Sequence, residues 1–283
     1  MPAGERGFVR EIALEGWRDI RSRPLMLLIV SASTLPFVFL LNFLLTPTNS
    51  GIDMILSLGG YAVCFALYFL FWCMAVVLYD THARSKKDAS YKDAFNRMEG
   101  WAWPSFLAGL LCGLVSIIAF LIAQIVVGIL LSFLAAGQTS GTSITVLQNV
   151  AIFLTYIVAD AAIVFIALVP QMLQLERGRK VEEVLRASYH KIKEHYKDAL
   201  LLFILPDLVT KILITGSILL ILRIREYAPL FVLLLLVFSI LEAGRIVFVA
   251  ASFNHLYYYL LEEEKQKRKA KPKKQPQKQA KRK

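Results

Sequence analysis

Apolar runs long enough to cross a bilayer recur along this chain, and polar turns separate them. About 20 apolar residues cross the hydrocarbon core of a membrane as an α-helix, so each run predicts one membrane span. The pattern therefore predicts an all-α fold, a polytopic transmembrane helical bundle of six spans. The predicted spans cover residues 25–45, 52–79, 104–136, 146–175, 199–222 and 229–261.

Short amphipathic segments lead into several of these spans from the cytoplasmic side. Residues 181–194 place Val184 and Ile192 on one helical face and charged residues on the rest. Similar patterns predict an amphipathic helix within residues 1–24 and another within residues 91–102. Such helices lie at the bilayer interface or on the cytoplasmic ends of a bundle. For residues 181–194, a solvated connector helix is the alternative.

Lysine and arginine are distributed unevenly between the two sides that alternating spans define. The N-terminus, residues 80–103, residues 176–198 and the C-terminal tail fall on one side and carry 28 of the 32 basic residues. The loops on the other side carry only Arg223 and Arg225. Cytoplasmic loops are enriched in Lys and Arg, so we predict a multi-pass protein of the inner (plasma) membrane with both termini in the cytoplasm.

The composition fits a membrane protein, because 57% of the residues are hydrophobic and the mean hydropathy is +0.57. The net charge of +11 resembles that of a nucleic-acid binder, but eleven of the basic residues follow Leu261. Residues 262–283 are rich in Lys, Gln and Pro, which predicts a disordered basic cytoplasmic tail. The chain thus divides into an N-terminal helix in residues 1–24, a six-span domain in residues 25–261 and this tail.

One order of elements occurs three times: an amphipathic helix, a span, a short outer loop and a second span. The units begin near Val9, Tyr91 and Val181, and each begins and ends in the predicted cytoplasm. Repeats of this kind are parallel and are related by an axis along the membrane normal. The alternative is three unrelated hairpins of similar length, and the sequence leaves both interpretations open.

The region after the fourth span has a recognisable pattern. An apolar helix ends near Pro170, and a basic turn with a glycine precedes residues 182–189, which contain Leu-Arg-Ala-Ser. Trp17 before the first span and residues 253–259 near the end of the last fit the same pattern. Together these features resemble the six-helix membrane domain attached to some glycerophosphodiester phosphodiesterases, and the chain is similar to YciC-like bacterial integral membrane proteins. The resemblance implies the fold but no defined reaction. The phosphodiesterase catalytic domain has no counterpart in this sequence, and the long basic tail departs from the family pattern.

The sequence carries no enzyme signature. It contains no His-Glu-x-x-His, no Gly-x-Ser-x-Gly and no P-loop. His190 and His195 are five residues apart, a spacing that does not place two metal ligands on one helical face. The cysteines lie within apolar runs, which argues against a disulfide framework. We therefore predict a protein without enzymatic activity, cofactor or bound metal.

Ionisable residues inside the predicted spans are the candidate site, because a charge at the centre of a bilayer costs about 2.5–3.5 kcal/mol. Asp207 and Lys211 are one helical turn apart, as are Glu242 and Arg245, so each pair can neutralise itself. Asp160 needs a partner from another helix, which we predict to be Arg245 or Lys211. Two interpretations are open: a structural contact between helices, or the proton or substrate site of a small-molecule or ion transporter.

The basic tail predicts contact with a polyanion. Acidic lipid headgroups are the nearest partner, ribosomal or other RNA is the alternative, and a tail that only sets topology and solubility is a third option. We predict a membrane scaffold or envelope-maintenance protein that engages anionic lipid or a cytosolic partner through this tail. The alternatives are a transporter, a ribosome- or insertion-machinery-associated protein and an enzyme acting on lipids. The predicted anionic-surface residues are Lys265, Lys267, Arg268, Lys269, Lys271, Lys273, Lys274, Lys278, Lys281, Arg282 and Lys283.

Overall fold

The computed structural model describes residues 5–25, 27–28, 30, 32, 51–85, 91–135, 141–176, 178–224 and 228–270. Within these residues the chain forms helices and no strands, which confirms the all-α prediction. The first predicted span lies largely outside them. The helices are α1 (Glu5–Ser22), α3 (Gly51–Ser85), α4 (Tyr91–Glu99), α5 (Ala102–Ala135), α6 (Gly141–Ile163), the 3-10 helix η1 (Val164–Ile166), α7 (Val169–Leu175), α8 (Val181–Glu194), α9 (Tyr196–Ile224) and α10 (Ala228–Ala270).

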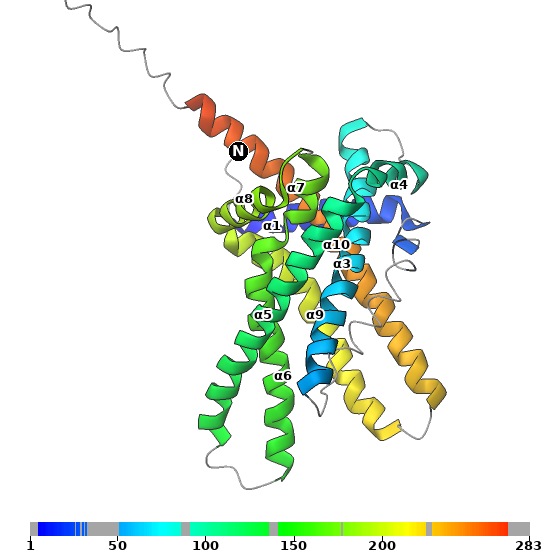
Figure 1. Ribbon diagram of the computed structural model, residues 1–283, viewed down its shortest axis with the longest axis vertical. Helices are drawn as coiled ribbons and strands as arrows, with labels where there is room; N and C mark the ends of the chain where they lie inside the picture. Colours follow the sequence, from blue (N-terminus) through cyan, green and yellow to red (C-terminus); the bar gives the residue numbers. More distant parts are fainter. Residues whose placement is uncertain are drawn as a thin grey trace, which may run out of the picture.

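The long helices form a bundle, and the short helices gather at one end of it (Figure 1). We call this the polar end, which comprises α1, α4, α8 and the part of α10 beyond Ser252. α5 and α6 form one hairpin, and α9 and α10 form another. The two hairpins converge near the polar end and spread apart toward the opposite end, with α3 between them (Figure 1).

Three helical segments in the described part of the chain are long and apolar enough to cross a membrane. They are Ser57–Asp80, Ala102–Phe133 and Phe153–Leu175, with 24, 32 and 23 residues. Each exceeds the roughly 20 residues that a bilayer requires, which agrees with the prediction of a helical membrane protein. The further spans that bring the number to six stay predictions.

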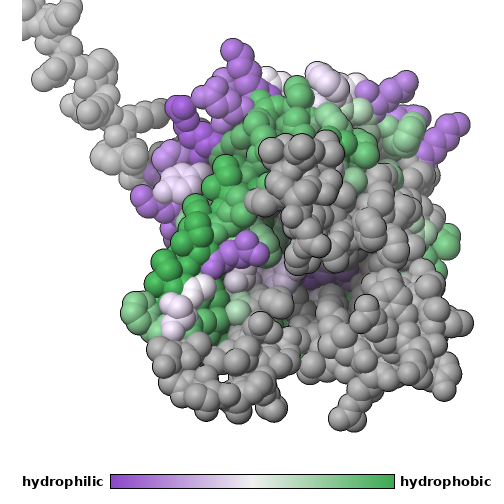
Figure 2. All heavy atoms as spheres, turned by 60° about the horizontal axis from the view of Figure 1, so that its bottom comes forward, coloured by the Kyte–Doolittle hydropathy of each residue, from purple (hydrophilic) through white to green (hydrophobic). Residues whose placement is uncertain are grey.

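α5 turns most of its side chains outward. Only 17% of its apolar window is buried inside the protein, against 61% for the window of α3. Ile118, Ile125 and Phe133 are 56%, 63% and 78% exposed. Figure 2 shows one flank of the molecule as continuous hydrophobic surface, with hydrophilic side chains gathered beyond it. An apolar surface of this extent suits contact with lipid better than contact with water.

Glycines bring α3 and α5 into close contact. A Cβ atom at Gly109 would lie 2.7 Å from Cβ of Phe69 and 2.9 Å from Cα of Ala66. One turn later, a Cβ atom at Gly113 would lie 3.2 Å from Cβ of Phe65. Small residues spaced by four let the backbones of membrane helices approach within van der Waals contact. α5 therefore packs tightly along α3, which is the inner helix of the bundle.

The fourth predicted span is broken rather than continuous, since α6, η1 and α7 divide it. Pro170 has no N–H and lies in the first turn of α7, where proline is tolerated but the helix before it must end. The Ser188 hydroxyl donates to the carbonyl of Phe165 at 2.8 Å. The Tyr196 hydroxyl donates to the carbonyl of Ala161 at 3.0 Å. Side chains from α8 and α9 thus bind carbonyls at the break.

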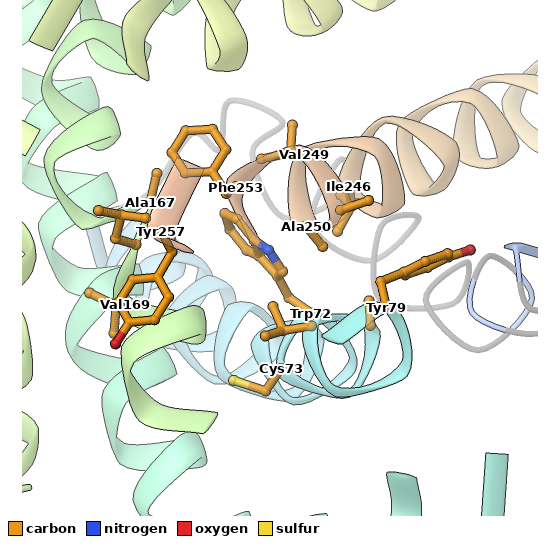
Figure 3. Close-up of a cluster of buried hydrophobic side chains, with 14 of the residues drawn as sticks. Trp72, Cys73, Tyr79, Ala167, Val169, Ile246, Val249, Ala250, Phe253 and Tyr257 are labelled. Carbon is orange, nitrogen blue, oxygen red and sulfur yellow. The ribbon is translucent and has the colours of Figure 1, made fainter. Parts of the chain in front are cut away.

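The core lies where α3, α7 and α10 meet, close to the polar end. Trp72, Phe253 and Tyr257 are buried there and pack among small side chains (Figure 3). The Asn254 amide on α10 donates to the carbonyl of Val76 on α3 at 3.0 Å. Apolar packing and a buried hydrogen bond therefore hold these two helices in one relative position.

α1 and α8 both pack onto this core. Ile12 and Ile20 of α1 are buried, and a Cβ atom at Gly16 would lie 3.0 Å from Cα of Ser252, so α1 crosses α10 at close range. The buried side chains of α8 are Val184, Ser188 and Ile192. They lie on the face that the sequence predicts, and α8 contacts η1 and α7. This helix is part of the bundle and not a solvated connector.

The predicted start of the disordered tail at residue 262 is wrong, because α10 continues as one helix to Ala270. Its last turns contact α8 through charged side chains, and these contacts favour helix in a segment whose composition alone predicts disorder. Residues 271–283 lie outside the described residues.

Candidate functional site

Arg245 on α10 is at the centre of a buried charge cluster. Its guanidinium lies 3.1 Å from the carboxylate of Asp207 on α9. Its Nε donates to Glu242, one turn earlier on α10, at 3.0 Å. The side chains of Arg245, Asp207 and Glu242 are 13%, 4% and 21% exposed. One guanidinium thus joins carboxylates from two helices in a region where an unpaired charge is costly.

The residues of α9 around Asp207 interrupt the helical hydrogen bonding and contribute a second contact to Arg245. Pro206 lies inside the helix and has no N–H, so one hydrogen bond of the helical ladder is missing there. The Thr210 hydroxyl donates to the carbonyl of Pro206 at 3.0 Å. Phe203, one turn before Asp207, lies under the Arg245 guanidinium at 5.9 Å from the ring centroid, a cation–π contact. α9 therefore presents a carboxylate and an aromatic ring to the same cation.

Two tyrosines of α3 face this cluster. The Tyr68 hydroxyl lies within electrostatic range of Arg245 and Glu242. The Tyr61 hydroxyl lies within range of the same two groups and of Asp160 on α6. Asp160 is 8% exposed and Tyr68 is 6% exposed. The cluster therefore draws on α3, α6, α9 and α10, and we call it the charge cluster: Tyr61, Tyr68, Asp160, Asp207, Glu242 and Arg245.

The pairing of Glu242 with Arg245, which the spacing along α10 predicts, is confirmed. The spacing also pairs Asp207 with Lys211 along α9, whereas the structure places Asp207 against Arg245 on the neighbouring helix. The side chain of Lys211 lies outside the described part of the chain. The pairing of Asp160 with Arg245 or Lys211 stays a prediction.

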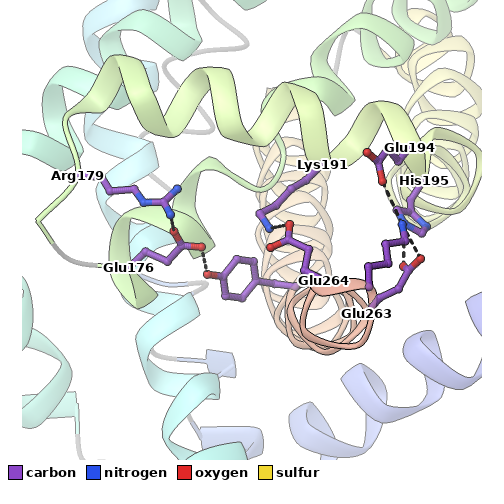
Figure 4. A network of polar contacts seen from close by, with 9 residues as sticks. Glu176, Arg179, Lys191, Glu194, His195, Glu263 and Glu264 are labelled. Atoms are coloured by element: carbon purple, nitrogen blue, oxygen red, sulfur yellow. Dashed lines mark hydrogen bonds and ion pairs between the residues drawn. The ribbon is translucent and has the colours of Figure 1, made fainter. Parts of the chain in front are cut away.

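A second polar network joins α8 to the C-terminal end of α10 (Figure 4). Lys191 pairs with Glu264, and Nε2 of His195 lies 3.0 Å from a carboxylate oxygen of Glu263. Lys267 contacts Glu263 at 2.9 Å. Hydrogen bonds to carboxylates, first of all the one to Glu263, raise the pKa of Lys267. The end of α10 is thus fixed on α8.

The turn before α8 belongs to the same polar end. Gly178 has a φ of 98°, in the left-handed region that favours glycine. Glu176 accepts a hydrogen bond from the Tyr257 hydroxyl on α10 and pairs with Arg179 at 2.8 Å (Figure 4). These contacts fix α7, α8 and α10 relative to one another.

His255 joins α10 to α1 at the polar end. The predicted span 229–261 includes it, but its ring contacts the charged side chains of Asp19 and Glu15, so the apolar part of this span ends before it. Its Nε2 lies 2.7 Å from Asp19, and its Nδ1 lies 3.2 Å from Glu15. Burial by itself lowers the pKa of His255, but the hydrogen bond to Asp19 and the charges of both carboxylates outweigh burial. The pKa of His255 is therefore raised above its ordinary value of 6.5, which favours the cationic ring between two anions.

The structure describes only part of the predicted anionic surface. Lys265, Lys267 and Lys269 are exposed on the last turns of α10. The side chain of Arg268 and residues 271–283 lie outside the described residues. Binding of this segment to an anionic surface stays a prediction.

No group of three or more His, Cys, Asp or Glu side chains suited to a metal ion occurs in the part of the chain that the structure describes. Cys64, Cys73 and Cys112 are free thiols. His195 faces α10, whereas His190 is exposed on α8. The two histidines therefore do not share a site.

Sequence reasoning missed the tyrosines of the charge cluster and the contacts of His255. Tyr61 and Tyr68 are seven residues apart, which is two turns of one helix. Their spacing in the sequence therefore predicts that they lie on the same face. Nothing along the chain indicates that this face meets Arg245. The contact of His255 with Asp19 depends on α1 crossing α10, which no local pattern shows.

Comparison of this chain with protein families, with curated proteins and with solved structures finds no match. The fold and the sites above therefore rest on the residues of this chain.

Proposed function

We propose that this protein is a six-span scaffold of the inner membrane, with both termini in the cytoplasm, that engages acidic lipid headgroups through its basic tail. The observation that supports this proposal is the course of α10. One helix runs from Ala228 to Ala270, out of the apolar bundle and past the polar end. The helices that resemble the membrane domain attached to some glycerophosphodiester phosphodiesterases fit the same architecture.

The contacts of α10 with α8 fix where the tail begins. In Figure 1 the C-terminal end of α10 projects beyond the bundle at the end where the short helices gather. Lys191 and His195 hold its Glu264 and Glu263, so two of the three acidic residues of this segment are already paired within the protein. Lys265 and Lys269 are exposed beside them. Glu263 and Glu264 before the tail are thus bound to α8, and Lys265 and Lys269 are exposed.

Electrostatic attraction and proximity favour acidic lipid over RNA as the partner of the tail. A lysine or arginine near an anionic membrane surface contributes about 1 kcal/mol, and the attraction is lost beyond a Debye length of roughly 8–10 Å. The tail is attached to the last span, so acidic headgroups are always within reach. RNA would bind by the same release of counterions, but residues 270–283 contain no aromatic side chain for stacking on bases.

The experiment measures how close the tail lies to the bilayer in the full-length protein. A donor dye is attached at Lys283→Cys, in a chain carrying Cys64→Ser, and the protein is reconstituted into vesicles with an acceptor dye on the headgroups. Energy transfer should be higher in acidic vesicles than in neutral ones and should fall as salt is added. Replacing three tail lysines by glutamine should reduce the difference; these are Lys271, Lys273 and Lys274.

A matched control removes three exposed lysines elsewhere at the polar end: Lys92, Lys193 and Lys197. This variant should keep the response of the unaltered tail. Equal energy transfer in neutral and acidic vesicles contradicts the lipid partner. Loss of the acidic-lipid signal on addition of ribosomes at matched salt would replace the lipid by the translation machinery.

A further inference from the structure

Helix α1 carries acidic and basic side chains on different faces. Glu15 and Asp19 are directed toward α10, where they contact the two nitrogens of the His255 ring. Arg10 and Arg21 are exposed. With 3.6 residues per turn, positions 10 and 21 lie roughly 120–180° around the helix from positions 15 and 19. The helix therefore turns its carboxylates to the protein and these arginines away from it.

Two large apolar side chains lie on the same face as these arginines. Leu14 and Trp17 are 43% and 54% exposed. Positions 10, 14, 17 and 21 have the spacing of one helical stripe, and Arg18 is exposed at its edge. We call these five residues the α1 stripe: Arg10, Leu14, Trp17, Arg18 and Arg21. The stripe combines three cationic side chains with apolar surface and contains no carboxylate.

The arginines of the stripe are free to bind an outside partner. None of the three forms an ion pair with a residue in the part of the chain that the structure describes. Glu15, one turn before Arg18, contacts His255. Glu11 is exposed beside the stripe, but it lies two turns from Arg18, about 10 Å along the helix axis. Guanidinium groups bind phosphate through paired hydrogen bonds, so this surface suits phosphate groups.

The stripe lies close to the predicted membrane. α1 belongs to the polar end, and its Gly16 packs against Ser252, where this end of α10 begins (Figure 1). Four residues after the stripe, the first predicted span starts with Leu25 and Leu28, which are 65% and 64% exposed. Exposed leucines of this kind suit contact with lipid tails. A tryptophan and arginines one turn before such residues are typical of a helix at the membrane surface.

We propose that the α1 stripe is a binding surface for acidic lipid headgroups. Its guanidinium groups bind the phosphates, and Leu14 and Trp17 enter the boundary between headgroups and hydrocarbon. Lipid is the partner rather than RNA because the attached span keeps the stripe beside the headgroups, and because Leu14 adds apolar surface that a nucleic-acid backbone does not need. The surface is a folded part of α1 and needs none of the residues of the tail proposed above.

The test measures lipid binding to the full-length protein by native mass spectrometry in a neutral detergent. Phosphatidylglycerol is the acidic probe, and phosphatidylcholine is the probe with a phosphate but no net charge. Phosphatidylglycerol should bind more tightly, and its binding should weaken as salt is added. One arginine near an acidic surface contributes about a fivefold factor in affinity. The stripe variant, which combines Arg10→Gln, Arg18→Gln and Arg21→Gln, should therefore bind phosphatidylglycerol roughly tenfold more weakly or less tightly still.

Two backgrounds separate the stripe from the tail. The stripe variant is compared with its parent in the unaltered chain and in the tail variant described above, in which three lysines are glutamine. The loss of affinity should be the same in both backgrounds. A charge-matched control neutralises three exposed basic residues of α8 and α9 and should change the affinity less than about twofold, because these residues lie outside the stripe. The control combines Arg186→Gln, Lys193→Gln and Lys197→Gln.

Further variants separate lipid binding from folding. The substituted arginines are exposed, so the stripe variant should unfold at the same temperature as the unaltered protein in detergent without added lipid. Lysine at all three positions keeps the charge and should restore most of the affinity for phosphatidylglycerol. If the stripe variant does not fold, Arg21→Gln alone carries the test, with an expected loss of about fivefold.

Equal affinity of the unaltered protein for the two lipids would overturn the proposal. An affinity for phosphatidylglycerol that the stripe variant keeps in both backgrounds would also overturn it. If the tail variant keeps full affinity and the stripe variant loses it, the stripe holds the lipid and the tail does not. Loss of binding to an RNA oligonucleotide in the stripe variant, with lipid affinity unchanged, would identify RNA as the partner and overturn the lipid.

Discussion

His255 contacts carboxylates through both ring nitrogens, and these contacts make the junction of α1 and α10 depend on pH. The pKa of His255 in the folded protein is raised, so the stability that the charged ring contributes is fully present below the unfolded pKa of about 6.5. It is lost as pH rises through the folded pKa. His255→Gln should therefore cost about 1.5–3 kcal/mol at pH 6, the range for hydrogen bonds to charged groups, and much less at pH 9. Thermal unfolding in mild detergent at the two pH values measures this difference.

His190→Gln is the matched control, because His190 is exposed on α8. Its effect on stability should be small at both pH values. Asp19 is 14% exposed and Glu15 is 52% exposed, so Asp19→Asn should reduce the pH dependence more than Glu15→Gln. A cost of His255→Gln that is the same at pH 6 and pH 9 would show that the ring acts by packing and not by charge.

The residues of the charge cluster show what sequence reasoning can reach at this scale. Four of its ionisable residues were predicted from their position inside apolar runs: Asp160, Asp207, Glu242 and Arg245. The Glu242–Arg245 contact followed from one turn of α10. The contact of Asp207 with Arg245 was not predictable. It depends on how α9 rotates against α10, and Asp207 has a local partner in Lys211 that spacing alone prefers.

Among the helices, α3 and α5 owe their close packing to glycine, and this packing predicts a clear difference between two substitutions on α5. Gly109→Ala places a carbon 2.7 Å from Phe69 and 2.9 Å from the backbone of Ala66, so the helices must separate. Overpacking of this kind costs about 1–3 kcal/mol. Gly128→Ala on the same helix meets nothing within 4 Å and should leave stability unchanged or slightly raised. Thermal unfolding of the two variants, purified in the same detergent, gives the comparison.

Equal stability of Gly109→Ala and the unaltered protein would mean that α3 and α5 pack less closely than the structure shows. A loss caused by Gly128→Ala would mean instead that the outer face of α5 contacts another helix. The second outcome would identify a protein partner where we expect lipid.

Most of the long helices could be predicted from the sequence, because the length of an apolar run predicts a helical span. α5 begins at Ala102 and ends at Ala135, close to the predicted 104–136. The break between α6 and α7 was not predicted, although Pro170 was visible in the sequence. Hydropathy averages over such a break, and its stability depends on Ser188 and Tyr196 from helices further along the chain.

The predicted start of the disordered tail at residue 262 is wrong for a related reason. The composition of residues 262–270 predicts disorder, because the segment has almost no apolar side chains to bury. Helix there depends on pairs such as Lys191–Glu264 that form only after α8 and α10 have come together. The order of elements, by contrast, agrees with the repeating units: α4, α5 and α6 form one set, and α8, α9 and α10 form another.

At the scale of the whole molecule, apolar and polar surfaces divide along the long axis, and the proposed orientation follows from this division. The exposed side chains of α5 are uncharged over 32 residues and, apart from Gln124 and Ser132, apolar, whereas charged contacts gather at the polar end. The same end carries the segments in which Lys and Arg are concentrated, so it is the expected cytoplasmic face. This prediction is tested by labelling with a thiol reagent that does not cross membranes, added outside intact cells.

Single cysteines at Ser50, Ser140 and Glu226 fall in the three loops predicted to lie outside and should react with this reagent. Cysteines at Ser85 and Arg179 fall on the predicted cytoplasmic side and should react only after the membrane is permeabilised. The unaltered chain supplies the blank, because Cys73 and Cys112 are fully buried and Cys64 lies within an apolar helix. A reversed pattern would place the polar end outside and remove the proposed contact of the tail with acidic cytoplasmic lipid. Reaction at Ser140 but not at Ser50 or Glu226 would instead contradict the count of six spans, because it would leave only the α5–α6 hairpin across the membrane.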